Sequence, residues 1–253
     1  MQDGGQPSAL RPVVVLCHGF KGFMDWGFLP YVSTRLARAG FVSVSLNASG
    51  CGVGDDPLVM DDEEAFFRDT YTRQLEDIAR VREYARGLEG VDPRRDALLG
   101  HSRGGGMCVI SAAEEPPAAL VTWAAIDQSD RFDEATKALW RAEGELRIPN
   151  GRTGQIHRLS VEALDDFERN AGRLDIVAAA ARYGGPLLAI HGRDDATVPW
   201  AAAERLAQAG PRGASLILDG ASHGFDATHP MEHAPEALEA AIGATLHHLE
   251  PLS

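Results

Sequence analysis

A serine in a glycine-rich turn is the first candidate in the sequence for a residue that does chemistry. Ser102 lies in Gly100-His101-Ser102-Arg103-Gly104-Gly105, between the apolar run 97–99 and the small-residue run 106–113. We interpret the first run as a buried strand and the second as a helix, which puts the serine at a tight strand-to-helix turn. Glycines on either side suit such a turn because they lack a Cβ atom. An ordinary structural turn is the alternative, and other residues must decide between the two.

A serine hydroxyl is a weak nucleophile, so it needs a base and an acid that orients the base. His223 can be the base, because imidazole titrates near neutral pH. Three aspartates follow predicted strands and are candidates for the acid: Asp127, Asp194 and Asp195. Neighbouring side chains on an extended loop point in different directions, so only one of Asp194 and Asp195 can reach His223.

Strands that alternate with helices must position these residues. Apolar and β-branched runs predict buried strands at 13–17, 41–46, 97–99, 118–126, 186–191 and 214–218. Amphipathic periodicity and glycine signals predict helices at 28–39, 67–88, 106–113, 200–209 and 235–249. This alternation predicts an α/β fold with a doubly wound, mainly parallel sheet, in one domain over residues 1–253.

The pattern changes over residues 127–185, which we interpret as an inserted helical lid rather than a second domain. Helices are predicted there at 160–170 and 174–183, and residues 148–154 read as a loop. The position after one strand and before the next places this lid above the carboxyl ends of the sheet, where ligands bind. Trp140 and Arg152 are therefore candidate substrate-binding residues. Trp140, with Phe132 and Trp26, lines a pocket or belongs to the core, and the sequence leaves both interpretations open.

Composition and charge restrict the partners. The 253 residues carry 24 basic and 37 acidic side chains, a net charge of −13, which argues against binding to nucleic acids or anionic membranes. No apolar run approaches the roughly 20 residues that cross a membrane. Three cysteines, Cys17, Cys51 and Cys108, are read as free thiols in a reducing compartment, so we expect a cytoplasmic protein.

The sequence resembles the α/β-hydrolase superfamily from about Val13 to Leu249. Within it the chain looks like the dienelactone-hydrolase-like and cinnamoyl-esterase-like branch. Four pieces carry the likeness: the Ser102 motif, His18-Gly19-Phe20, His191-Gly192-x-x-Asp195-x-x-Val198-Pro199, and Ser222-His223-Gly224-Phe225. Dienelactone hydrolases proper have a cysteine nucleophile, whereas Ser102 favours ester hydrolysis by a serine. Superfamily members usually have two more strands before the first one here, so the sheet is expected to be shortened at that edge.

The resemblance implies a catalytic triad in the order Ser102, Asp195, His223. Its spacing selects Asp195 as the acid, with Asp127 as the next choice. It also implies that the backbone amides of Phe20 and Arg103 bind the oxyanion of the tetrahedral intermediate.

The implied reaction is hydrolysis of a small-molecule carboxylic ester through an acyl-serine intermediate, with no cofactor and no metal. The same triad serves thioesterases, peptidases and C–C bond hydrolases, and some members of the fold only bind ligands. His18 and His191 are interpreted as structural, and a metal site of His223, His229 and His233 is not expected. The natural substrate and the oligomeric state stay open.

Overall fold

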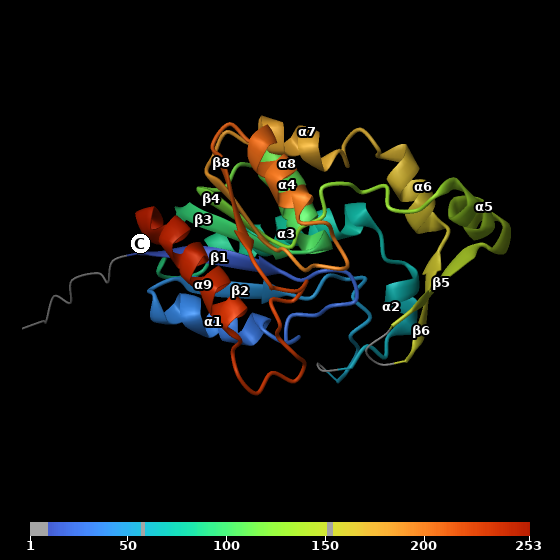
Figure 1. Ribbon diagram of the computed structural model, residues 1–253, viewed down its shortest axis with the longest axis horizontal. Coiled ribbons are helices and arrows are strands. Elements are labelled where there is room, and N and C mark those ends of the chain that lie inside the picture. Colours follow the sequence, from blue (N-terminus) through green and yellow to red (C-terminus); the bar gives the residue numbers. More distant parts are fainter. Residues whose placement is uncertain (1–9, 57–58, 151–153) are drawn as a thin grey trace, which may run out of the picture.

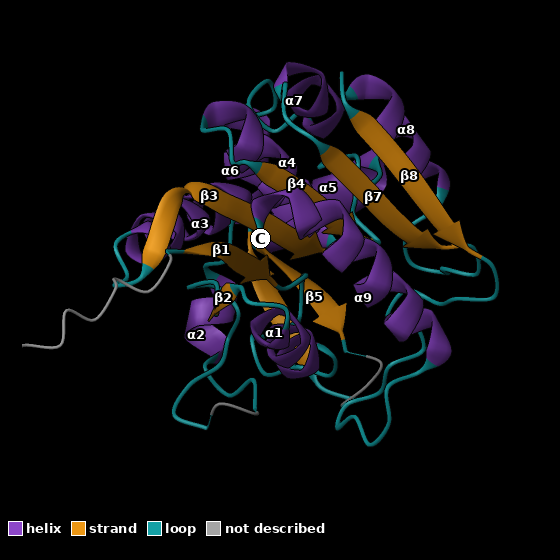
Figure 2. Ribbon diagram, turned by 90° about the vertical axis from the view of Figure 1, so that its left-hand side faces the viewer, coloured by secondary structure: helices purple, strands orange, loops and turns teal. Residues whose placement is uncertain are grey.

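A computed structural model describes residues 10–56, 59–150 and 154–253 of the chain. Its centre is a parallel sheet with the strand order β2-β1-β3-β4-β7-β8 (Figures 1 and 2). The six strands are β1 (Arg11–Cys17), β2 (Val42–Leu46), β3 (Val91–His101), β4 (Ala119–Trp123), β7 (Leu187–Gly192) and β8 (Gly213–Leu218). In the described part of the chain the sheet ends at β2, as expected for the shortened edge.

Helices cover both faces of the sheet because both faces are apolar, as the fully buried β4 illustrates. One face packs against α1 (Leu29–Arg38) and α9 (Glu236–Leu249), which ends in a short 3₁₀ turn at Glu250–Leu252 (Figure 1). The other face packs against four helices: α3 (Tyr71–Arg86), α4 (Arg103–Glu114), α7 (Ile176–Arg182) and α8 (Ala201–Ala209). The doubly wound parallel sheet expected from the sequence is confirmed.

The helix predicted over 67–88 begins later than expected, at Tyr71. A short helix, α2 (Glu63–Phe67), precedes α3, and each has its own polar cap. Asp62 accepts a hydrogen bond from the Ala65 amide at 2.9 Å, and Thr70 accepts one from the Arg73 amide at 3.2 Å. Caps of this kind satisfy the free amides at a helix start, so a new helix begins after Thr70 although the apolar spacing indicates a helix from Phe67.

The segment between β4 and β7, here called the insertion, is not purely helical, and the expectation of a helical lid is wrong on this point. After α5 (Glu134–Glu143) the chain forms an antiparallel hairpin, β5 (Glu145–Pro149) with β6 (Ile156–Ser160), followed by α6 (Glu162–Arg169) (Figure 1). In β5 the apolar Leu146 and Ile148 alternate with the charged Glu145 and Arg147. Leu146, Ile148 and Leu159 pack on Trp140 in a small cluster that Phe20 also joins, while Arg147 and Arg158 extend into solvent.

The last helix predicted in the insertion belongs to the main body. Helix α7 packs between α4 and α8, and its Ile176, Ala179 and Ala180 are buried in the cluster on that face of the sheet. The part of 127–185 that stands apart from the sheet therefore ends before α7. In Figure 1, α5, the hairpin and α6 lie together at one end of the molecule, next to α2.

Candidate active site

Ser102 stands at the turn between β3 and α4 in a strained backbone conformation, with φ 55° and ψ −122°. The turn is possible because its neighbours lack side chains. A Cβ atom on Gly104 would lie 2.2 Å from the His18 carbonyl oxygen, and one on Gly100 would lie 2.5 Å from the Gly104 carbonyl oxygen. The glycines thus let the helix start, the β1 loop and the serine approach one another closely. This geometry is that of a nucleophile elbow.

The structure brings Ser102, His223 and Asp195 into one hydrogen-bonded chain. The Ser102 hydroxyl lies 3.1 Å from His223 Nε2, and His223 Nδ1 lies 2.7 Å from Asp195 Oδ2. His223 comes from the loop after β8 and Asp195 from the loop after β7, so all three follow the carboxyl ends of parallel strands. A carboxylate at Nδ1 holds the ring in the tautomer whose Nε2 can accept the serine proton.

The carboxylate of Asp195 accepts four hydrogen bonds and is fully buried. Oδ2 accepts from His223 and also from His191 Nε2 at 3.0 Å, while Oδ1 accepts from the amides of Thr197 (2.7 Å) and Val198 (2.9 Å). Burial by itself raises the pKa of this carboxyl, but the hydrogen bonds from His191, His223 and Val198 outweigh it and hold the pKa well below its usual value. Asp195 is therefore ionised at neutral pH.

The two alternative acids lie elsewhere. Asp194 is exposed, and its amide donates to the Ala221 carbonyl oxygen at 3.0 Å. Asp127 forms an ion pair with Arg205 on α8. Of the three aspartates, the geometry therefore joins only Asp195 to His223.

Three further histidines, His18, His101 and His191, form hydrogen bonds around the site. Those of His18 and His191 agree with the structural roles inferred from the sequence. His18 accepts a hydrogen bond from the Ala48 amide at Nε2 (3.0 Å) and donates from Nδ1 to the Gly19 carbonyl oxygen (2.8 Å), which ties the β1 loop to the loop after β2. His191 donates to Asp195, as above. His101, the residue before Ser102, donates from Nε2 to the His223 carbonyl oxygen at 3.0 Å. The contacts of His191 with Asp195 and of His101 with His223 could not be inferred from spacing.

The segments that carry Phe20 and Arg103 flank the serine. Arg103 is the first residue of α4, so its amide has no acceptor within the helix. Phe20 follows Gly19, on which a Cβ atom would lie 2.8 Å from the Cβ of Ser102, so this loop packs directly against Ser102. Both residues line the same cavity as Ser102. The arrangement suits two amide donors aimed at an anion beside the serine.

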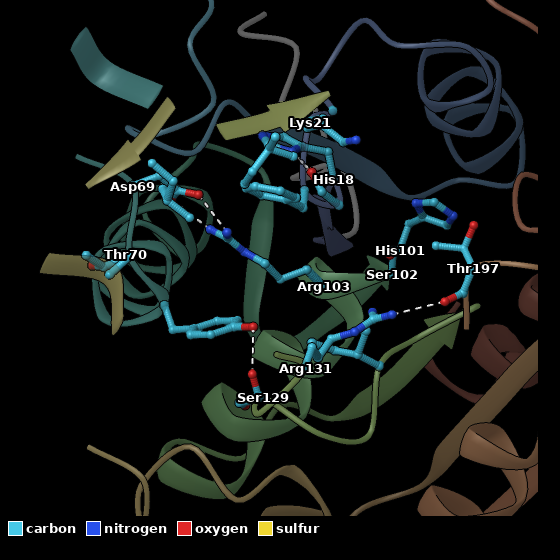
Figure 3. Close-up of a pocket in the computed structure, with 18 of the residues that line it drawn as sticks. His18, Lys21, Asp69, Thr70, His101, Ser102, Arg103, Ser129, Arg131 and Thr197 are labelled. Atoms are coloured by element: carbon cyan, nitrogen blue, oxygen red, sulfur yellow. Dashed lines mark hydrogen bonds and ion pairs between the residues drawn. The ribbon is translucent and has the colours of Figure 1, made fainter. Parts of the chain in front are cut away.

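A cavity of about 620 Å³ is lined by Ser102, His223 and several residues of the insertion. Figure 3 shows Ser102 and Arg103 among its lining residues. Trp140, Phe132 and Trp26 all line it, so the aromatic residues left open by the sequence take part in the pocket. Trp140 also belongs to the core of the insertion: it is 2% exposed, and its Nε1 donates to the Leu159 carbonyl oxygen at 3.1 Å. Arg152, the other candidate, lies outside the described residues.

The described residues contain no cluster of three or more His, Cys, Asp or Glu side chains that could hold a metal ion. His229, one of the histidines considered for a metal, accepts a hydrogen bond from the Gly27 amide at Nδ1 (2.9 Å) and stacks on Trp26. Nor does any helix in the described ranges have the length and apolarity to cross a membrane. Cys17, Cys51 and Cys108 are buried free thiols.

Solved structures similar to this chain share its fold at low sequence identity. Est1E from Butyrivibrio proteoclasticus, with ferulic acid bound, is 21% identical over 99% of this chain and 93% of its own, with a TM-score of 0.73. A monoacylglycerol lipase from Paleococcus ferrophilus is 19% identical over 97% of both chains, with a TM-score of 0.66. The esterase domain of a Rhodothermus marinus protein is 19% identical over 96% of this chain and 90% of its own, with a TM-score of 0.61.

Sequence comparisons give two kinds of match. Two curated relatives, each described as an uncharacterized 31.7 kDa protein in the traX-finO intergenic region of Escherichia coli, are 33% and 32% identical over 105 residues. The match covers 42% of this chain and 34% of each relative, so the chain spans about a third of their length. The model of the alpha/beta hydrolase family matches residues 14–241, from β1 into α9. The chain therefore belongs to the alpha/beta hydrolase family.

Proposed function

We propose that this protein is a serine hydrolase that cleaves carboxylic esters through an acyl-serine intermediate. The observation that carries the proposal is the hydrogen-bonded chain from Asp195 through His223 to the Ser102 hydroxyl. The family assignment supports hydrolysis in general, and the serine nucleophile with its aromatic-lined cavity favours esters.

In the proposed mechanism Ser102 Oγ attacks the ester carbonyl carbon while His223 Nε2 takes the hydroxyl proton. The carbonyl oxygen becomes an oxyanion and is bound by the amides of Phe20 and Arg103. The intermediate collapses, the bond to the alcohol oxygen breaks, and His223 gives its proton to the departing alcohol. Water then attacks the acyl-serine with His223 as base, which releases the acid and restores the serine. Asp195 stabilises the imidazolium in both halves.

Labelling with a fluorophosphonate probe and hydrolysis of p-nitrophenyl esters test the proposal together. We expect the probe to attach to Ser102, identified by peptide mass mapping, and the Ser102→Ala variant to lose both labelling and turnover. Ser33→Ala, on α1 away from the cavity, is the matched control and keeps both. A chain that only binds ligands would not be labelled, and that result would refute the proposal.

An ester panel addresses the choice of substrate. Since the Est1E structure holds ferulic acid, a feruloyl ester belongs in the panel beside p-nitrophenyl esters of increasing acyl length, a thioester and a peptide. The proposal predicts that an oxygen ester has the highest kcat/KM. Preference for the thioester or the peptide would move the assignment to those classes on the same triad.

The free thiols further support a reducing compartment, and we propose the cytoplasm.

A further inference from the structure

The two amides expected to bind the oxyanion come from segments more than eighty residues apart in the chain. The Phe20 amide lies in a tight turn after β1, in which the Gly22 amide donates to the Gly19 carbonyl oxygen at 3.1 Å. Lys21, within this turn, has φ 57°, in the left-handed region that disfavours residues with a side chain. Such a conformation persists only where the surroundings hold it, so the direction of the Phe20 amide depends on contacts outside the turn.

The Arg103 side chain provides such a contact. Its guanidinium carbon lies 5.0 Å from the centroid of the Phe20 ring and 5.1 Å from that of Tyr71. A guanidinium over an aromatic ring is attracted by the negative face of the ring. The two residues whose amides flank the nucleophile thus also touch through their side chains.

Arg103 is itself held at several points (Figure 3). Nη1 lies 2.6 Å from Asp69 Oδ2, Nη2 donates to Asp69 Oδ1 at 2.7 Å, and Nε donates to Gln74 Oε1 at 2.8 Å. Gln74 in turn donates from Nε2 to the His18 carbonyl oxygen at 3.3 Å, at the start of the Phe20 turn. The network therefore runs from Arg103 at the helix start through Gln74 to the loop that presents Phe20, while Asp69 holds the guanidinium as a separate anchor.

This ion pair is an inefficient way to stabilise a fold. The side chains of Arg103 and Asp69 are 12% and 4% exposed, and removing two charges from water costs about as much as their attraction returns. The chain also leaves room for Asp69, because a Cβ atom on Gly50 would lie 2.4 Å from its Oδ1. All three nitrogens of the Arg103 guanidinium already donate, and two aromatic rings lie against it. Few of its N–H groups are therefore available to bind a substrate.

We propose that the Arg103 side chain is a positioning residue, which holds the Phe20 amide where it can bind the oxyanion. This role is separate from that of the Arg103 amide, and it rests on the proposed ester hydrolysis. Asp69 and Gln74 are the anchors that hold the guanidinium over Phe20.

The test uses Arg103→Met and Asp69→Asn, with Arg103→Lys as the conservative variant that keeps a charge near Asp69 but loses the planar fork. The matched controls are Arg82→Met and Asp96→Asn. Arg82 Nη2 lies 2.9 Å from Asp96 Oδ2, and these side chains are 1% and 6% exposed, so this pair is at least as buried. Asp96 precedes Ser102 by six residues along β3, which places it roughly 20 Å away.

Each variant is assayed for kcat and KM on a p-nitrophenyl ester and for the Ki of a trifluoromethyl ketone, whose adduct with Ser102 is an oxyanion. Rates are normalised to the fraction labelled by a fluorophosphonate. Removing one oxyanion donor costs about 10²–10³ in kcat, so displacing one is expected to cost roughly tenfold to a hundredfold. In Arg103→Met and Asp69→Asn we expect this loss in kcat, a parallel rise in Ki, and KM within about threefold of wild type. Arg103→Lys should regain part of the loss.

The controls should lose stability while keeping kcat and Ki. Unchanged kcat and Ki in both Asp69→Asn and Arg103→Lys would overturn the proposal, as would an equal loss in Arg82→Met or Asp96→Asn. If Arg103→Met does not fold, Asp69→Asn and Arg103→Lys still decide the question. Failure of the proposed function looks different, because the wild-type protein would then neither hydrolyse esters nor react with the probe.

Discussion

Replacing Asp195 by asparagine is expected to lower kcat by about 10⁴, the size of effect seen when the acid of a serine triad becomes an amide. The structure explains why an amide cannot substitute here. Four donors point at the two carboxylate oxygens: two ring nitrogens at Oδ2, from His223 and His191, and two backbone amides at Oδ1. Asparagine has one acceptor oxygen, so its NH₂ group must face one of these two pairs.

The backbone amides are fixed donors, whereas an imidazole can move its proton. We therefore expect the asparagine oxygen to face the amides of Thr197 and Val198 and its NH₂ group to face His223 Nδ1. His223 must then accept at Nδ1 and carry its proton on Nε2, 3.1 Å from Ser102 Oγ. In that tautomer the ring cannot take the serine proton, which is the origin of the expected loss.

The measurement is kcat on a saturating p-nitrophenyl ester at neutral pH, with Asp194→Asn and Asp127→Asn assayed beside Asp195→Asn. Because Asp194 is exposed and Asp127 pairs with Arg205, both controls should stay within a few-fold of the wild-type rate. A near-normal rate for Asp195→Asn, or a collapse in either control, would refute the assignment of the acid while leaving the serine hydrolase proposal in place.

Three further outcomes are expected. Ser102→Ala should abolish turnover and leave the far-UV circular dichroism spectrum unchanged. Esterase activity equal to that of the wild type would contradict the proposed nucleophile. Burial lowers the pKa of His18 to about 4 and that of His101 to about 3, so both resist protonation when folded but not when unfolded. The contribution of these histidines to the free energy of unfolding is therefore complete above about pH 6.5. It falls at lower pH, by about 2 kcal/mol for each histidine at pH 5. Urea unfolding at pH 7.5 and pH 5 measures this loss, which should be smaller by about 2 kcal/mol in His101→Gln; an equal loss in that variant would argue against the cause. Trp140→Phe should change the ranking of p-nitrophenyl esters by acyl length at a stability cost of about 1 kcal/mol from the lost bond to Leu159, and an unchanged ranking would remove Trp140 from the set of specificity residues.

Local sequence determined the sheet and the elbow. Continuous β-branched runs such as 13–17 can be buried only between two helix layers, and this is how β1 lies in the structure. The glycines near Ser102 predict a tight turn, and the close approach of Gly104 to the His18 carbonyl oxygen agrees with this. The predicted strands place Asp195 and His223 in the loops that follow them. Because parallel strands end at one edge of a sheet, these loops are expected to lie near Ser102.

Local sequence patterns predicted the secondary structure of the insertion incorrectly. The charged residues among 145–160 gave no strand signal, yet the segment forms a hairpin. Its apolar face is covered by Trp140, which lies outside the hairpin in the sequence. Helix α7 read as part of the lid, yet it packs on α4 and α8, because burial depends on which neighbours a helix meets and not on its place in the sequence.

Only the tertiary structure decided which side chains support the site. Asp69 and Gln74 lie on or beside a helix whose periodicity indicates nothing about Arg103. The sequence indicates a structural role for His191 but not that it donates to Asp195. Residue types and spacing specify a strand, a helix or a motif because the forces behind them act between near neighbours in the chain. The partners of a buried charge are set by distances between segments that the fold brings together, and no local pattern contains those distances.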